Sequence, residues 1–250
     1  MSTHPLVHAF KRLRLTDMAH AVEDLLATHP EAADAVGRCA STLAVAQENG
    51  RAQRRLEKLA REAKLPWPSA ALETLRRRPR GGLNQRYVDQ LADCEWIRRH
   101  EHLVITGPSG TGKTKLACAW GTQALRLGMR VLFFDTHSLL EEWRAAKQQK
   151  RLNEFRHRLD RADLLILDQV LTLPLSPRKQ CRLTKLLLDR HEKRSTLLVS
   201  TLGLADWYTR MPDQTMAELL VDRYMASHQF YLRGDSLRSR SVPGEASPEA

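Results

Sequence analysis

One stretch of the sequence has the residue types and spacing needed to hold a chain of phosphates. It reads Gly107-Pro108-Ser109-Gly110-Thr111-Gly112-Lys113-Thr114, and it meets every fixed position of the pattern glycine, four residues, Gly-Lys-Ser/Thr. Glycines let successive backbone N–H groups point at an anion, and the N-terminus of a following helix adds partial positive charge. Lys113 would then reach the β- and γ-phosphates, and the Thr114 hydroxyl would ligate Mg²⁺. The stretch therefore predicts a loop that binds ATP with Mg²⁺.

A second candidate is a carboxylate that follows an apolar run. Asp168 ends the run 164–167, and a short, ionised side chain at the carboxyl end of a buried strand can hold a water of the Mg²⁺ shell. ATPases of this type usually have Glu next, as the base for the attacking water, but here the residue is Gln169. An amide orients a water and cannot take its proton. Either Gln169 is the native residue and hydrolysis is slow, or the residue was changed to hold ATP unhydrolysed.

Strands and helices must position these side chains, and the sequence alternates between the two. The β-branched run 103–106 precedes the loop, and apolar positions from 116 to 125 follow it at helical spacing. Further along, we predict strands at 130–135, 164–168, 196–201 and 229–233, and helices at 138–159, 178–193 and 214–227. This alternation predicts an α/β fold, a parallel sheet covered by helices on both faces.

The first hundred residues have a different pattern and predict a small all-α N-terminal domain. Residues 6–28 fit a helical hairpin or a kinked helix, and 31–65 fit a second helical stretch. Prolines at 66 and 68 end that helix, and a basic loop from Arg76 to Gly82 leads to a helix over 84–99. We expect four parts: a helical domain at 1–65, a basic linker and lead-in helix at 66–100, a nucleotide-binding core at 101–238 and a disordered tail at 239–250.

The charge of the chain favours a polyanionic partner. The formal net charge is +11 and the pI is about 9.9, which is high for an enzyme that acts on small molecules. Residues 51–86 contain nine Arg and two Lys against Glu57, Glu62 and Glu73. Arginine makes bidentate phosphate contacts, so this segment predicts contacts with the backbone of double-stranded DNA. The alternative is a solvated helix face followed by a flexible loop. Trp67, between two prolines, is interpreted as a packing anchor rather than a base-stacking platform.

The rest of the composition narrows the class of protein further. No apolar run is long enough to span a bilayer, and the polar N-terminus lacks a signal-peptide core, so we expect a cytoplasmic protein with no membrane partner. The four cysteines have no paired spacing and are interpreted as reduced thiols that bind no metal.

Beyond these motifs, the chain resembles the IstB family, AAA+ ATPase helpers of insertion-sequence transposases that are related to the helicase loader DnaC and the initiator DnaA. The similarity covers nearly the whole chain. It includes the loop and strand motifs above, Leu13-Arg14-Leu15 with Met18-Ala19, Leu173-Pro174-Leu175, Arg194-Ser195-Thr196, Asp222-Arg223 and Gly234-Asp235-Ser236-Leu237-Arg238. The resemblance implies an AAA+ core, ATP-dependent self-association on DNA, and delivery of target DNA to a partner transposase.

The resemblance also implies roles for residues outside the loop. Thr201 stands where the family tends to have Asn as the polar sensor of the γ-phosphate, and a hydroxyl can still hydrogen-bond a water. Arg223 lies where the family has a basic residue near a neighbouring subunit's ATP, so it would act in trans on the γ-phosphate. The alternative is a surface ion pair between Asp222 and a nearby base. Arg238 matches a C-terminal arginine of the family and has no assigned contact.

Three functions are consistent with these observations. The first is a DNA-binding AAA+ ATPase that assists transposition. The second, a replicative helicase loader, has the same fold. The third is a DNA-binding scaffold that ATP switches with little hydrolysis, which Gln169 and Thr201 favour. A basic kinase with a phosphate-binding loop is less consistent, because the positive region has no obvious pocket for a small acceptor.

Overall fold

The computed structural model describes residues 5–29, 33–76, 83–211 and 213–234. The chain divides into two compact units, one up to Lys58 and one from Leu59 onward. Most of the expected basic loop, Arg238 and the tail at 239–250 lie outside the described residues. In the part of the chain that the structure describes, no helix is both long and apolar enough to cross a membrane.

The N-terminal unit consists of a helical hairpin and the first part of a long helix. The helices α1 (Pro5–Arg12) and α2 (Thr16–Thr28) are separate, so the predicted hairpin is confirmed and the kinked helix is wrong. The long helix is α3 (Ala33–Ala63), which corresponds to the stretch predicted at 31–65. The three helices share a small apolar core made of Leu6, Val7, Phe10, Leu13, Ala19 and Ala44. The unit is therefore all-α, as predicted.

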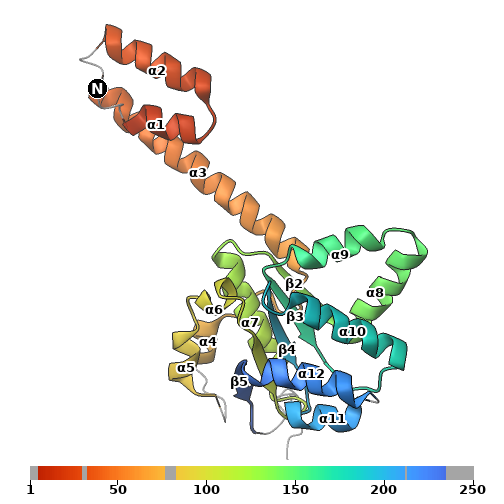
Figure 1. Ribbon diagram of the computed structural model, residues 1–250. Coiled ribbons are helices and arrows are strands. Elements are labelled where there is room, and N and C mark those ends of the chain that lie inside the picture. The colour runs from red at the N-terminus through yellow and green to blue at the C-terminus, as the bar shows by residue number, and fades with distance from the viewer. Residues whose placement is uncertain (1–4, 30–32, 77–82, 212, 235–250) are drawn as a thin grey trace, which may run out of the picture. The chain divides into compact units, whose positions relative to one another are not determined.

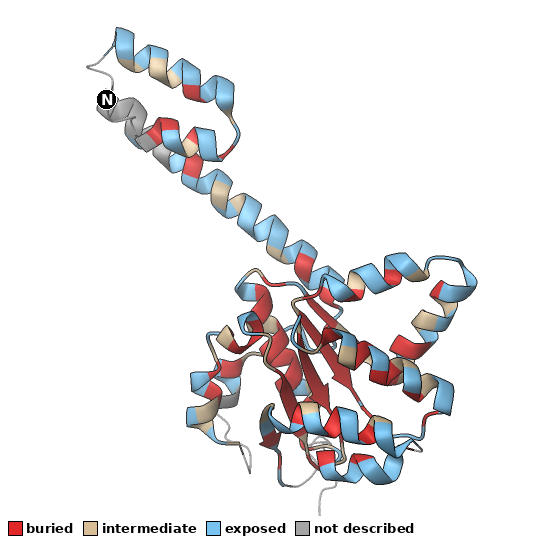
Figure 2. Ribbon diagram, in the orientation of Figure 1, coloured by how far each residue is buried: buried red, intermediate tan, exposed pale blue. Residues whose placement is uncertain are grey.

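A five-stranded parallel sheet organises the second unit, in the order β2-β3-β4-β1-β5 (Figure 1). The strands are β1 (Leu103–Thr106), β2 (Val131–Asp135), β3 (Leu164–Asp168), β4 (Ser195–Val199) and β5 (His228–Tyr231). All neighbouring pairs run parallel. Every residue of β3 and β4 is buried, and Figure 2 shows the same concentration of buried residues in the strands. Strands buried on both faces are expected when helices cover both sides of a sheet.

The helices of this unit lie on both faces of the sheet. They are α4 (Leu72–Arg76), α5 (Gln85–Gln90), α6 (Glu95–Arg98), α7 (Lys113–Arg126), α8 (Thr136–Gln148), α9 (Leu152–Asp160), α10 (Pro177–Arg190), α11 (Trp207–Arg210) and α12 (Gln214–Met225).

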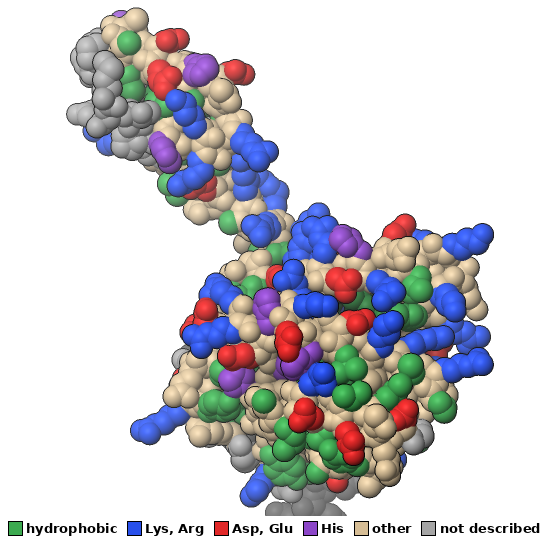
Figure 3. All heavy atoms as spheres, viewed as in Figure 1, with side chains coloured by type: hydrophobic (Ala, Val, Ile, Leu, Met, Phe, Trp, Pro, Cys, Tyr) green, Lys and Arg blue, Asp and Glu red, His purple; other side chains and the backbone are tan. Residues whose placement is uncertain are grey.

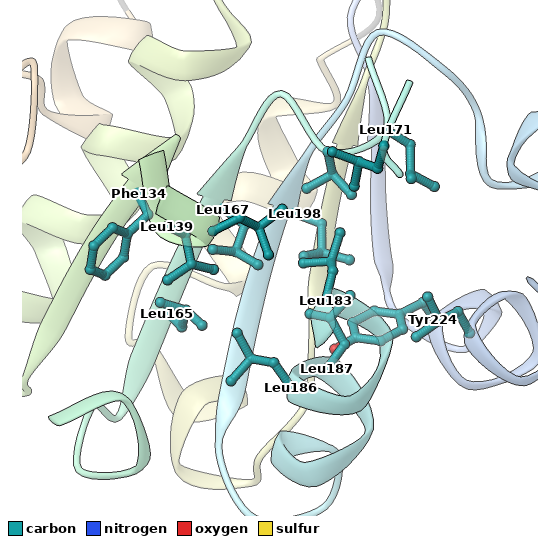
Figure 4. Close-up of a cluster of buried hydrophobic side chains, with 14 of the residues drawn as sticks. Phe134, Leu139, Leu165, Leu167, Leu171, Leu183, Leu186, Leu187, Leu198 and Tyr224 are labelled. Carbon is teal, nitrogen blue, oxygen red and sulfur yellow. The ribbon is translucent and has the colours of Figure 1, made fainter. Parts of the chain in front are cut away.

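Alternate residues of β3 point to the two helical layers. Leu165 belongs to the large apolar cluster that includes Leu183 of α10 and Tyr224 of α12 (Figure 4). Ile166 faces α7, which packs so closely that a Cβ on Gly121 would lie 2.9 Å from the Ile166 Cδ1 atom. Successive side chains of a strand point to opposite faces, so the two contacts lie on opposite sides of the sheet. The predicted parallel sheet with helices on both faces is confirmed.

The helix predicted at 138–159 is two helices, α8 and α9, and that prediction is wrong. The chain turns at Lys150, which has a φ of 57°, a conformation that ends a right-handed helix. The turn brings Trp143 of α8 and Phe155 of α9 together, with ring centroids 5.9 Å apart. Apolar spacing alone looks continuous here because both helices bury apolar residues at similar intervals.

The helix predicted at 84–99 is also divided, into α5 and α6. Cys94 has a φ of 57° and redirects the chain so that Trp96 packs edge-on against Trp120 of α7, with centroids 6.1 Å apart. The remaining predicted elements are present with boundaries that differ by a few residues. Both Cys94 and Cys118 are buried free thiols, and Cys181 is an exposed one.

Candidate nucleotide-binding site

The glycine loop joins β1 to α7, and its backbone uses conformations that glycine permits. The φ angles are 136° at Gly107, 81° at Gly110 and 87° at Gly112, a region that residues with a Cβ rarely adopt. A Cβ on Gly107 would also lie 2.2 Å from the carbonyl oxygen of Leu232. Any other residue at position 107 would therefore displace the chain that follows β5. The backbone of the predicted loop is therefore curved in the way that binding a phosphate chain requires.

Lys113 is the first residue of α7, and its side chain is 7% exposed. Its Nζ donates a hydrogen bond to the carbonyl oxygen of Pro108 at 2.7 Å. The Thr111 hydroxyl donates to the same carbonyl at 2.9 Å. The ammonium group thus lies against the loop at the N-terminus of a 14-residue helix, where the helix dipole adds partial positive charge. Both contributions favour a negatively charged ligand.

Thr114 and Asp168, which are distant in sequence, are in contact. The Thr114 hydroxyl donates to Oδ2 of Asp168 at 2.7 Å, and the carboxylate is 7% exposed at the end of β3. Burial raises the pKa of Asp168 above its usual value, although hydrogen bonds from Thr114 and from the Gln169 N–H lower it. A divalent cation beside this carboxylate would favour its ionised form. A hydroxyl and a carboxylate are oxygen ligands of the kind that Mg²⁺ prefers, so these residues fit Mg²⁺ with a phosphate chain.

Two polar residues that the sequence analysis did not single out hold the end of β3. The buried Thr136, first residue of α8, donates from Oγ1 to the carbonyl oxygen of Asp168 at 2.7 Å. The Ser200 hydroxyl, just after β4, donates to the carbonyl oxygen of Val170 at 2.7 Å. In the sequence, each of the two is a hydroxyl residue directly after an apolar strand. Such residues are common, so this position alone does not indicate a functional site. Their hydrogen-bond partners depend on which strands lie side by side in the sheet.

Gln169 and Thr201 lie at the carboxyl ends of neighbouring strands, β3 and β4. The Gln169 side chain is exposed, its φ is 58°, and its N–H donates to Oδ1 of Asp168 at 2.9 Å. The Thr201 hydroxyl donates to the Thr172 hydroxyl at 3.3 Å. The glycine loop follows β1, the other neighbour of β4. The fold therefore brings Gln169 and Thr201 to the same end of the sheet as the loop, where the parallel strands have their carboxyl ends.

Arg223 is a predicted residue that the fold does not join to this group. It is partly buried on α12, and its guanidinium donates a hydrogen bond to the carbonyl oxygen of Leu219 on the same helix at 3.3 Å. An arginine that acts in trans contacts the ATP of a second subunit, so this role of Arg223 depends on contacts between subunits.

The fold and the loop together define the class of protein. One strand, β4, separates the strand that precedes the glycine loop from the strand that ends in Asp168, and all five strands are parallel. This is a P-loop nucleotide-binding protein of the AAA+ class. The chain belongs to the family of IstB-like ATP-binding proteins, which it matches over residues 8–243.

Curated relatives agree with this family. The chain is 34% identical over 239 residues to the "Insertion sequence IS21 putative ATP-binding protein" of Pseudomonas aeruginosa, covering 94% of this chain and 89% of the relative. It is 37% identical over 205 residues to the protein of the same description from insertion sequence IS1162 of Pseudomonas fluorescens, covering 81% and 87%. The resemblance inferred from the motifs is confirmed, and the chain is a member of an ATP-binding family of insertion sequences.

Solved structures support the fold. AMPPCP-bound DnaA from Aquifex aeolicus aligns with a TM-score of 0.56 at 24% identity, over 67% of this chain and 51% of that one. The DnaC helicase loader aligns with a TM-score of 0.54 at 19% identity, over 66% and 97%. The fold of the nucleotide-binding core therefore matches these solved structures.

Proposed function

We propose that this protein hydrolyses ATP with Mg²⁺, binds double-stranded DNA and acts as the helper of an insertion-sequence transposase. The observation that carries the proposal is the 2.7 Å contact between Thr114 and Asp168 beside the loop that holds Lys113. Loop, hydroxyl and carboxylate are the parts needed to hold a nucleotide with its metal. The relatives are named for insertion sequences, which supports a role in moving such elements.

Each residue of the site has a distinct task in this proposal. Lys113 exchanges the Pro108 carbonyl for the β- and γ-phosphates, and the loop N–H groups bind the remaining phosphate oxygens. Thr114 and Asp168 hold Mg²⁺ and its water shell. When bound, Mg²⁺ would neutralise the charge that develops on the phosphates. Gln169 orients the attacking water without taking its proton, and Thr201 contacts the γ-phosphate directly or through a water.

DNA binding is assigned to the basic segment at 51–86. On α3, the side chains of Arg54, Arg55 and Arg61 are exposed, and so is that of Lys64 directly after the helix. Arg51 donates to the carbonyl oxygen of Leu13 at 3.0 Å. Exposed arginines along a helix can follow a phosphate backbone without reading bases. The cluster at 76–80 adds further positive charge, although its side chains lie outside the described residues.

Replacing Arg76, Arg77, Arg78 and Arg80 by Ala should weaken DNA binding and make it less sensitive to salt. Each lost phosphate contact should lower the slope of log affinity against log salt by about one unit, since fewer counterions are released. Fluorescence anisotropy of a labelled duplex at several salt concentrations measures both quantities, and duplexes of different sequence should give similar values.

A matched control removes four positive charges elsewhere. Arg144 and Lys147 of α8 and Arg182 and Lys185 of α10 lie on the surface of the second unit, where Figure 3 shows many basic side chains. Replacing these four by Ala changes the net charge equally. If the control lowers the slope as much as the first set does, the effect is one of net charge, and the assignment of the 51–86 segment is wrong.

Self-association with ATP is also part of the proposal, with Arg223 at the subunit boundary. Arg223→Ala should leave ATP affinity of the isolated chain nearly unchanged and should lower the rate of hydrolysis at least tenfold, because an arginine acting in trans stabilises charge in the transition state. Turnover measured against protein concentration, together with sedimentation with and without ATP, checks this. Normal assembly and turnover in the variant would leave Arg223 as a surface residue only.

A second function, a DNA-binding scaffold switched by ATP, is favoured by one observation, the amide at position 169. Its expected behaviour is ATP-dependent DNA binding without measurable phosphate release. A helicase loader shares the fold, and a transposase gene beside the gene of this protein would favour the helper over the loader.

A further inference from the structure

Trp67 is an exposed tryptophan on a chain that buries most of its other large rings. Its exposed fraction is 51%, against 2% for Trp96 and 0% for Trp120 and Trp207. The interpretation of Trp67 as a packing anchor is therefore wrong. Its neighbours in sequence, Leu65 and Ala70, are the residues that pack, at 9% and 3% exposed. About half of the Trp67 surface remains open to solvent.

The backbone that carries this ring is held firmly. Pro66 and Pro68 fix φ on either side of Trp67. The Ala70 N–H donates to the carbonyl oxygen of Trp67 at 3.0 Å, and the Thr122 hydroxyl of α7 donates to the carbonyl oxygen of Pro68 at 3.4 Å. An aromatic ring presented on a rigid segment loses little conformational entropy when a ligand covers it.

A positive charge accompanies the ring. The Lys115 Nζ lies 5.7 Å from the centroid of the Trp67 ring, within the range of a cation–π contact. Lys115 directly follows Thr114, so this ammonium group is on the same helical turn of α7 as the hydroxyl that contacts Asp168. Arg61 and Lys64, both exposed, precede the ring in the chain. The surface at Trp67 therefore combines one flat apolar ring with the ammonium group of Lys115.

This combination suits a nucleic-acid base better than an apolar protein surface. A hydrophobic partner needs a contiguous apolar patch, whereas Trp67 is flanked by prolines and by exposed polar or basic residues such as Lys64, Ser69 and Lys115. A base offers a π-face to the ring, and the phosphate beside it offers a negative charge to the ammonium group.

We propose that Trp67 and Lys115 form a stacking platform for an unpaired base of a DNA strand. The indole ring stacks on the base, and Lys115 binds the adjacent phosphate. The proposal rests on the DNA-binding part of the proposed function and adds a single-stranded subsite to it. Because Lys115 and Thr114 are consecutive on α7, a strand on this platform would contact the helical turn that also holds the nucleotide site.

Tryptophan fluorescence tests the platform directly. Adding a thymine homopolymer, which forms no duplex, to the full-length protein should quench the emission contributed by Trp67. The difference between the spectra of the unchanged protein and Trp67→Phe isolates that emission. Trp143→Phe is the matched control, because Trp143 also has a cation over its ring, Arg156 at 5.9 Å, and should lose none of the quenching. Quenching by ATP with Mg²⁺ alone, and none by the oligonucleotide, would overturn the proposal.

Affinity and salt dependence separate this proposal from DNA binding in general. Trp67→Leu should bind the homopolymer about fivefold to a hundredfold more weakly with an unchanged salt slope, because no charge is lost. Trp67→Phe keeps a ring and should lose less. If the unchanged protein binds DNA with a steep salt slope and Trp67→Leu binds equally well, the platform is wrong while the proposed function stands. If the unchanged protein binds no DNA at all, both are wrong.

Discussion

Lys113→Ala is expected to weaken ATP binding by about a hundredfold, since charge-assisted hydrogen bonds to phosphate contribute about 1.5–3 kcal/mol each. The residue is the cation that the loop holds against the Pro108 carbonyl, so its loss removes the positive charge nearest the expected phosphates. The helix N-terminus and the glycine backbone remain and should leave weak residual binding. Titration with a fluorescent ATP analogue, or calorimetry, gives the change in affinity.

A matched control is Lys185→Ala on α10, where the side chain is exposed. It removes the same charge far along the sequence from the loop and should bind ATP as the unchanged protein does. The Lys113 variant should also lose any ATP-dependent assembly on DNA. Equal ATP affinity in the Lys113 variant and the control would remove the basis of the proposed nucleotide site.

Gln169→Glu is expected to raise the rate of ATP hydrolysis severalfold at least. A carboxylate at this position can take the proton of the attacking water, and general-base catalysis is commonly worth about a hundredfold or more. Glutamate is unbranched like glutamine, and the position has a φ of 58° with an exposed side chain, so the change should cost little stability. Phosphate release at saturating DNA measures the effect, and the lifetime of the complex on DNA after ATP is removed should become shorter.

Gln169→Met provides the opposite comparison at the same site. It keeps the length of the side chain and removes its hydrogen-bonding groups, so hydrolysis should fall below that of the unchanged protein if the amide orients the water. Fast turnover in the unchanged protein, with no gain from glutamate and no loss from methionine, would show that another residue activates the water.

The sequence alone was sufficient to predict the glycine loop and the class of fold. The loop pattern is local, because its eight positions are consecutive and backbone curl depends on the glycines within it. The alternation of apolar runs and helical spacing is also local, and β3 and β4 are buried throughout, as their apolar composition indicates. The family resemblance rests on motifs of the same kind, spread along nearly the whole chain.

The helix ends were predicted less well, because they depend on contacts between distant residues. The left-handed residues Lys150 and Cys94 divide two predicted helices, and neither is a glycine or a proline that would indicate a turn. The breaks become understandable only from the packing of Trp143 on Phe155 and of Trp96 on Trp120. Apolar periodicity does not say which neighbour an apolar residue will have.

Only the tertiary structure decided how the site residues meet. Residue types and order predicted Thr114 and Asp168 as parts of one site, but their direct contact depends on β4 lying between β1 and β3. Thr136 reaches the carbonyl of Asp168 because β2 and β3 pair in register, and Trp67 is 51% exposed while Leu65, two residues before it, lies against Gly121 of α7. Burial and hydrogen-bond partners depend on chain segments far apart in sequence, whereas the loop pattern depends on adjacent residues.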